Sequence, residues 1–190
     1  MQLPWDEHFY EIVVPAWQTY LQAERNLSEA AKTKDDSKIA RAVYDALREG
    51  GAASFYVHHF ADVVMRARPS WVPNSVQTLA ALRRWVANHC KTLRTETLCD
   101  DVSLLGDVAD ALKHAILTHR IATREVAAND AVLVAKSIYG KGRYGEGKFG
   151  GIQVVILAKS GTRPLSTVLQ NVVDAWRRVA SVPLPRIGEP

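Results

Sequence analysis

Hydrophobic residues recur at helical spacing from the start of the chain. In residues 5–32 the apolar positions lie three or four apart, and Pro15 falls where it bends this helix or starts another. Ser37 offers an N-cap for a second helix, whose apolar stripe continues until Gly50 and Gly51. The pattern therefore predicts a bent first helix, and a shorter second helix that ends at the two glycines.

Three more helices are predicted after the glycines. Residues 52–68 are strongly apolar, span more than four turns and end before Pro69, which is typical of a central buried helix. Asn74 or Ser75 can cap the next helix. The last of the three carries its apolar stripe at Leu105, Val108, Leu112 and Ile116.

The spacing of apolar residues changes towards the C-terminus. Residues 131–138 and 152–159 are two β-branched runs of the kind that form strands, and a glycine-rich loop separates them, which predicts an antiparallel hairpin. Ser160 and Gly161 are expected to form a turn, and Pro164 suits the first turn of a final helix. The predicted fold class is α+β, mainly α: a helical bundle followed by a C-terminal β-hairpin and a final helix.

Length and composition indicate one domain over residues 1–190, with the bundle in 1–125 and the hairpin plus last helix in 131–180. An apolar content of 47% is enough for one core without disulfides. We expect a cytoplasmic protein without a membrane segment, because no apolar stretch is long enough to span a bilayer and no signal pattern is present. The two cysteines fit neither a disulfide framework nor a paired zinc motif, so both are expected to be reduced.

Acidic and imidazole side chains share a face on two of the predicted helices. His58 and Asp62 are neighbours at i, i+4, an arrangement in which a carboxylate can orient an imidazole and raise its pKa. Asp107, Asp110 and His114 repeat the pattern on the later helix. If the two helices pack together, these groups converge on one groove and offer an acid–base pair or an incomplete metal site. The alternative is a pair of polar faces whose groups only hydrogen-bond.

The glycine-rich loop is a second candidate site. Its basic residues Lys141, Arg143 and Lys148 alternate with glycines and aromatic residues, a mixture that suits phosphate contact and base stacking. The net charge of +4 permits a nucleic-acid partner without requiring one. No phosphate-binding loop motif is present, and a solvent-exposed loop is the alternative interpretation.

Two segments carry a resemblance to known proteins. YVHHFAD, around His58, and GDVADALKHAIL, around Asp110, resemble a group of small uncharacterised bacterial proteins that also have a hairpin and a last helix with a tryptophan, here Trp176. The helical part is also similar to HEPN domains, whose motif is an arginine followed four to six residues later by a histidine. Arg83 or Arg84 with His89 has this spacing.

The HEPN-like resemblance implies an RNA-associated domain of bacterial or phage origin, acting as a metal-independent ribonuclease without a cofactor. In this hypothesis His58 or His114 exchanges protons with the substrate, and Asp62 and Asp110 orient the imidazoles. Lys113 then steadies the phosphate charge, and the basic residues of the loop hold the RNA backbone.

Two other functions stay open at the level of sequence. One is a non-catalytic protein-interaction module in which apolar helices form a homodimer. The other is a metal-binding helical bundle in which His58, His114 and one aspartate supply the ligands, although no dense two-histidine motif is present.

Overall fold

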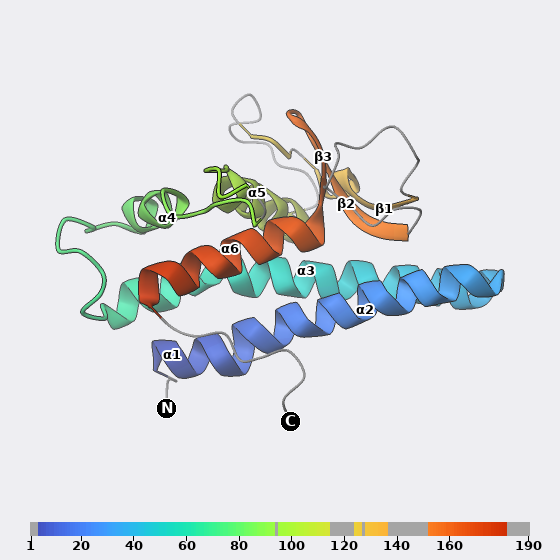
Figure 1. The fold of residues 1–190 in the computed structure, drawn as a ribbon, viewed down its shortest axis with the longest axis horizontal. Helices are drawn as coiled ribbons and strands as arrows, with labels where there is room; N and C mark the ends of the chain where they lie inside the picture. The colour runs from blue at the N-terminus through green and yellow to red at the C-terminus, as the bar shows by residue number, and fades with distance from the viewer. Residues whose placement is uncertain (1–3, 94, 115–123, 127, 137–151, 182–190) are drawn as a thin grey trace.

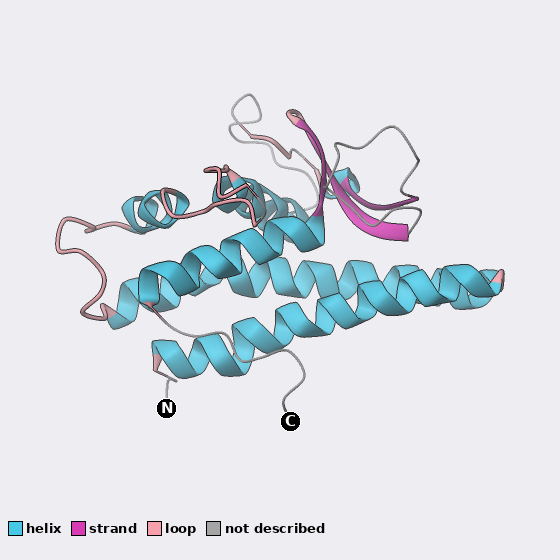
Figure 2. Cartoon of the chain, in the orientation of Figure 1, coloured by secondary structure: helices cyan, strands magenta, loops and turns pink. Residues whose placement is uncertain are grey.

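The computed structural model describes residues 4–93, 95–114, 124–126, 128–136 and 152–181. Within them helices dominate, and a small sheet precedes the last helix (Figure 2). The elements are, in chain order, α1 (Trp5–His8), the π-helical turn η1 (Phe9–Val13), α2 (Val14–Thr33), α3 (Asp36–Ala67), α4 (Leu79–Ala87), α5 (Asp101–His114), the 3-10 turn η3 (Asn129–Ala131), β1 (Val132–Lys136), β2 (Ile152–Ala158), β3 (Gly161–Pro164) and α6 (Leu165–Ala180).

The helix α3 is the centre of the fold. It forms a long antiparallel hairpin with α2 and also contacts α4, α5 and α6 (Figure 1). The sheet packs against α2, α3 and α6. The predicted class, α+β and mainly α with the sheet before a final helix, is therefore confirmed.

Pro15 lies where the regular α-helical pattern of the N-terminal segment is interrupted, and the bend predicted there stays a prediction. Pro15 lies in the first turn of α2, and the π-helical turn η1 directly precedes it. Proline has no N–H to donate to the preceding turn, and its ring crowds the carbonyl group there, so the preceding turn widens.

The prediction that the second helix ends at Gly50 and Gly51 is wrong. The helix α3 runs unbroken through both glycines, and Asp35 rather than Ser37 caps it by accepting from the backbone N–H groups of Ser37 and Lys38. Two glycines cost a helix about 2 kcal/mol relative to alanine. Packing offsets this cost, because a Cβ at Gly50 would lie only 2.9 Å from Leu165 Cδ2.

The helix boundaries that follow differ from prediction in smaller ways. Thr78 caps α4, its hydroxyl accepting from the backbone N–H of Ala81, so neither Asn74 nor Ser75 is the cap. Leu105 and Val108 of α5 are buried as predicted, while Ile116 lies outside the described residues.

The predicted hairpin is present, and it is extended by a strand that was not predicted. In the sheet β2 lies between β1 and β3, with both pairings antiparallel. Residues 161–164, expected to form a turn and the start of a helix, pair with β2 as β3. Residues 137–151, which include the end of the first predicted strand, lie outside the described residues.

One buried core joins the helices to the sheet. Its largest fully buried side chains are Phe9, Trp17, Tyr20, Leu27, Phe60, Leu82, Leu105, Ile156, Leu165 and Leu169. The apolar positions that recur at helical spacing in the final helix are all buried in α6: Leu165, Leu169, Val172, Val173, Trp176 and Val179. Among the described helices, none combines the length and the apolar character needed to cross a membrane.

Candidate functional site

Asp62 is bound by His59, not by the predicted partner His58. Its Oδ2 lies 3.0 Å from Nδ1 of His59, one turn earlier on α3, and 3.4 Å from Nη2 of Arg83 on α4. These side chains are 34%, 44% and 30% exposed for His59, Asp62 and Arg83, so a ligand can reach them. We call these three residues the His59 cluster.

The contact with Asp62 fixes how the His59 ring can act. When the imidazole is neutral, a proton on Nδ1 is donated to the carboxylate, and the lone pair is then on Nε2. Arg83 Nη2 donates to the same carboxylate oxygen, which ties α4 to α3. The cluster therefore combines an oriented imidazole with a guanidinium group, the side chains that move protons and hold phosphate in proteins.

Phe55 extends the cluster by one turn along α3. Its ring centroid lies 4.4 Å from that of His59, and the side chain is 41% exposed. A large exposed aromatic ring beside a histidine and an arginine is a surface on which a nucleic-acid base can stack.

His58 faces the contact between α3 and α5, and its ring lies edge-on to that of His59 with the centroids 5.1 Å apart. A Cβ at Gly106 would lie 2.9 Å from Cε1 of His58, so only glycine at this position leaves room for the imidazole. Burial, then the positive charge of Arg83 and the neighbouring His59, lowers the pKa of His58 to about 4. The sequence predicted a raised pKa, and this was wrong, because desolvation outweighs the opposing effect of Asp110 and Asp62.

The acids of α5 mainly hold the segment that follows the helix. Asp110 Oδ2 lies 3.0 Å from Nη1 of Arg124, and Asp107 accepts a 2.7 Å hydrogen bond from the backbone N–H of Glu125. Burial raises the pKa of Asp107. The predicted packing of the two helices is present, because α3 contacts α5 and His58 lies against Gly106.

Of the other predicted site residues, only Lys113 has a side chain within the described part of the structure. Lys113 is exposed on the last turn of α5, and its neighbour His114 ends that helix, its side chain lying outside the described residues. Lys141, Arg143 and Lys148 also lie outside the described residues. The meeting of His58 with His114 therefore stays a prediction.

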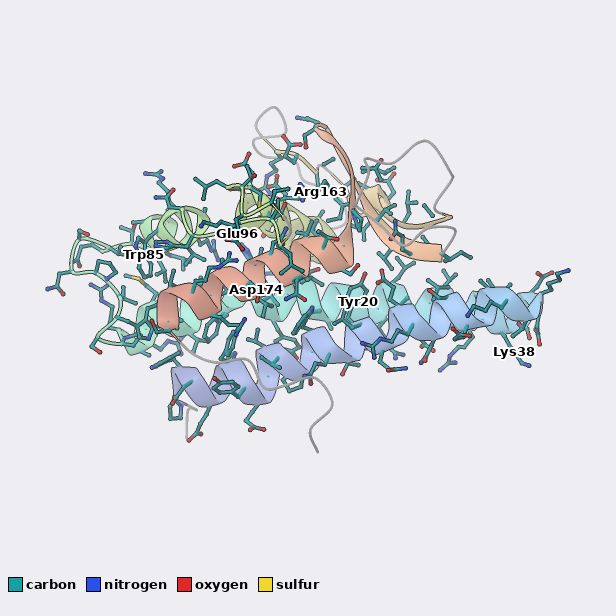
Figure 3. All side chains as sticks on the ribbon, in the orientation of Figure 1. Tyr20, Lys38, Trp85, Glu96, Arg163 and Asp174 are labelled. Carbon is teal, nitrogen blue, oxygen red and sulfur yellow. The ribbon has the colours of Figure 1, made fainter. Side chains whose placement is uncertain are left out.

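Neither arginine of the HEPN-like motif is seen in contact with His89 in the described residues. Arg83 binds Asp62, Arg84 is exposed, and Nδ1 of His89 lies 2.9 Å from the carbonyl oxygen of Trp85 (Trp85 is labelled in Figure 3). The His89 ring also packs edge-on against the ring of Trp85. His89 thus caps the end of α4, while Arg83 belongs to the His59 cluster.

Sequence reasoning missed Phe55 and did not give His59 a role at the site, and it named Arg83 only for its HEPN-like spacing to His89. The signal was present, because Asp62 is at i+3 from His59 as well as i+4 from His58, and both spacings place side chains on one face of a helix. The choice between the two histidines depends on which one faces α5. Gly106, which receives His58, lies 48 residues further along the chain.

No group of three or more histidine, cysteine, aspartate or glutamate side chains in the described residues is placed to hold a metal ion. No protein-family model matches the chain, and neither a curated protein nor a solved structure similar to it was found.

Proposed function

We propose that the chain is an RNA-associated domain and that the His59 cluster is its site for a phosphodiester. The observation that carries the proposal is the pair of contacts on Asp62, which hold an imidazole and a guanidinium side by side at the surface. In this proposal the role first expected of His58 passes to His59. His58 is partly buried instead, and its ring packs where Gly106 of α5 leaves room for it.

Arg83 supplies the phosphate contact. A guanidinium group has five N–H donors in a planar fork, and the contact with Asp62 uses Nη2. Nε is buried, so the donors left for phosphate oxygens are the other N–H groups of the two Nη atoms. Phe55, beside His59, then stacks against a base of single-stranded RNA.

The finer proposal is metal-independent cleavage of the RNA backbone. Nε2 of His59 accepts the proton of a 2′-hydroxyl group while the 2′-oxygen forms a bond to phosphorus. The bond from phosphorus to the 5′-oxygen breaks, and that oxygen takes a proton from water, which gives a 2′,3′-cyclic phosphate and a 5′-hydroxyl end. Asp62 keeps the ring oriented and stabilises its charge, and Arg83 stabilises the negative charge on the transferring phosphoryl group.

Binding and cleavage of a labelled single-stranded RNA, both measured in the presence of a chelator, test the RNA-binding proposal and the ribonuclease proposal separately. Wild-type protein is expected to bind in a salt-sensitive manner and to produce cyclic phosphate ends, while His59→Gln binds with similar affinity and does not cleave. Binding without cleavage by wild-type protein would remove the ribonuclease proposal and keep the RNA-associated domain. No salt-sensitive binding would remove both.

A second candidate, a homodimeric interaction module, is favoured by exposed aromatic residues on α3. Tyr44, Phe55 and Tyr56 are 62%, 41% and 40% exposed. Sedimentation at a series of protein concentrations tests it. A dimer that weakens in Phe55→Ala supports this candidate, and a monomer at every concentration contradicts it.

A further inference from the structure

Cys90 and Cys99 face each other across a short antiparallel turn. The backbone N–H of Cys99 donates to the carbonyl oxygen of Cys90 over 3.0 Å, and Lys91 pairs with Leu98 one step further. Residues directly opposite in such a pair have Cα atoms about 4.5–5.5 Å apart. This falls within the range of about 4.4–6.8 Å that a disulfide bond spans.

The two sulfur atoms are already close. Sγ of Cys90 lies 3.6 Å from Sγ of Cys99, compared with about 2.05 Å in a disulfide bond. The gap of about 1.5 Å can be closed by small side-chain rotations without moving the backbone. The two cysteines are also the only ones in the chain, so no other cysteine of the chain can form a disulfide bond with either.

The surroundings keep this geometry rigid. Glu96, in the same turn and labelled in Figure 3, pairs with Arg178 of α6 over 3.2 Å. Beneath the cysteines, the buried Asp101 accepts from Asn171 of α6 and pairs with Arg163 of β3. The turn is thus held at both ends, and the cysteines are brought together by the fold itself.

Access differs between the two thiols. Cys90 is fully buried, whereas Cys99 is only partly buried and can be reached from solvent. The hydrogen bond from the Cys90 thiol, together with burial, raises the pKa of Cys90, and accepting that bond lowers the pKa of Cys99. Cys99 is therefore the side chain that reacts first with a reagent from outside, and Cys90 is the one that completes the reaction.

We propose that Cys90 and Cys99 form a reversible dithiol–disulfide site whose co-reactant is a small-molecule disulfide such as oxidised glutathione. The Cys99 thiolate attacks one sulfur of the reagent, which forms a mixed disulfide and releases one thiolate. Cys90 loses its proton to solvent and attacks Sγ of Cys99, which forms the intramolecular bond and releases the second thiolate. The chain loses two protons and two electrons, which equal two hydrogen atoms, and the reagent becomes two thiols. The inference does not depend on RNA binding.

The test is an equilibration of the full chain with a series of reduced-to-oxidised glutathione ratios, followed by acid quenching, alkylation in denaturant and mass measurement. The expected product carries no alkyl group and has lost two hydrogens. Its equilibrium constant is expected to be at least about tenfold larger for the folded chain than for the chain in urea, because folding brings the sulfurs together.

Two single variants separate the roles of the cysteines. Cys90→Ser should accumulate a stable mixed disulfide with glutathione at Cys99, while Cys99→Ser should leave Cys90 reduced because it is buried. Equal equilibrium constants for the folded and unfolded chain, or two alkylated cysteines at every glutathione ratio, would overturn the proposal. A mixed disulfide that persists in the wild-type chain would overturn it as well, because Cys90 would then have failed to attack.

Discussion

Oδ2 of Asp62 lies 3.0 Å from Nδ1 of His59, and the same oxygen receives Nη2 of Arg83 at 3.4 Å. One carboxylate thus orients an imidazole on its own helix and joins α3 to α4. The His58 ring, one residue away in sequence, is turned towards Gly106 on α5 and has a different role. The two adjacent histidines therefore differ in what they contact: His59 contacts the partly exposed Asp62, which also binds Arg83, and His58 packs against α5.

Replacing Asp62 by asparagine should separate orientation from binding. The variant keeps the shape of the side chain but loses the charge that holds His59, so RNA cleavage is expected to slow by roughly 10- to 100-fold. RNA affinity should not fall, because a negative charge has been removed near the bound phosphate. Asp45→Asn, a change of the same kind nearer the start of α3, is the control and should cleave at the wild-type rate. Wild-type cleavage by Asp62→Asn would contradict the role of Asp62.

His58 should make the stability of the fold depend on pH. The pKa of His58 is about 4 in the folded chain, compared with an ordinary value of 6.5, which we take for the unfolded chain. Between pH 4 and pH 6.5 the unfolded chain therefore binds a proton at His58 more readily than the folded chain does. The contribution of neutral His58 is complete above about pH 6.5 and is lost as the pH falls towards 4, by roughly 3 kcal/mol in total.

Urea unfolding at pH 7 and pH 4.5 measures this effect. His58→Gln, which cannot be protonated in this range, should lose less stability than wild-type protein between the two pH values. His59→Gln should lose nearly as much stability as wild type, because burial, the largest cause of the lowered pKa of His58, is unchanged and only the smaller effect of His59 is removed. The same loss in wild type and in His58→Gln would show that other groups cause the pH dependence.

The approach of α3 to α5 should depend on Gly106. A Cβ there would lie 2.9 Å from Cε1 and 3.2 Å from Nδ1 of His58, so Gly106→Ala should lower the free energy of unfolding by about 1–3 kcal/mol. Gly51→Ala is the matched control, because its Cβ would lie 3.6 Å from Leu112 Cδ1, an ordinary contact. That variant should be neutral or up to about 1 kcal/mol more stable, since alanine favours the helix.

A double variant shows whether His58 is the cause. His58→Ala combined with Gly106→Ala should be less destabilised than the sum of the single variants, because the small side chain at position 58 removes the clash. Additive losses of stability would place the clash elsewhere.

Glu24 should anchor the sheet to α2. The carboxylate is buried and its Oε1 accepts from the hydroxyl group of Tyr20 at 3.0 Å and from the backbone N–H of Val154 in β2 at 3.3 Å. Glu24→Ala leaves both donors unpaired and should cost about 2–4 kcal/mol in urea unfolding. It should also speed hydrogen exchange at the amide of Val154.

The control for Glu24 lies on the same helix. Glu29 is exposed and pairs only with Lys32 among the described residues, so Glu29→Ala should change the free energy of unfolding by less than about 0.5 kcal/mol. Equal effects of the two variants would contradict the anchoring role of Glu24.

Much of the fold could be predicted from the spacing of apolar residues, because each helix or strand buries one face and that face sets the spacing. The apolar stripe of α6 and the start of α2 at Pro15 are examples of such local patterns. The continuity of α3 could not be predicted, since Gly50 is favoured there by contact with Leu165, a residue of α6. The strand β3 was missed because its four residues carry no alternating pattern and pair only through β2.

The candidate site was predicted only in part, because helical spacing is a local pattern and most of the site's contacts join distant segments. Helical spacing placed Asp62 near a histidine, but two adjacent histidines satisfy that spacing, and only packing against α5 separates them. Arg83 comes from α4, and no local pattern relates it to Asp62. Contacts between distant segments, which depend on the packed structure, decided each of these points.

The most direct test of the RNA site is a salt titration of RNA affinity for wild type, Arg83→Ala and Arg41→Ala, followed by fluorescence anisotropy. Arg41 pairs with Asp45 and lies about 27 Å along α3 from His59, so it is a matched control for loss of one positive charge. We predict that Arg83→Ala binds roughly tenfold more weakly and lowers the slope of log affinity against log salt by about one, while Arg41→Ala matches wild type. Equal affinities and slopes for all three proteins would contradict the account.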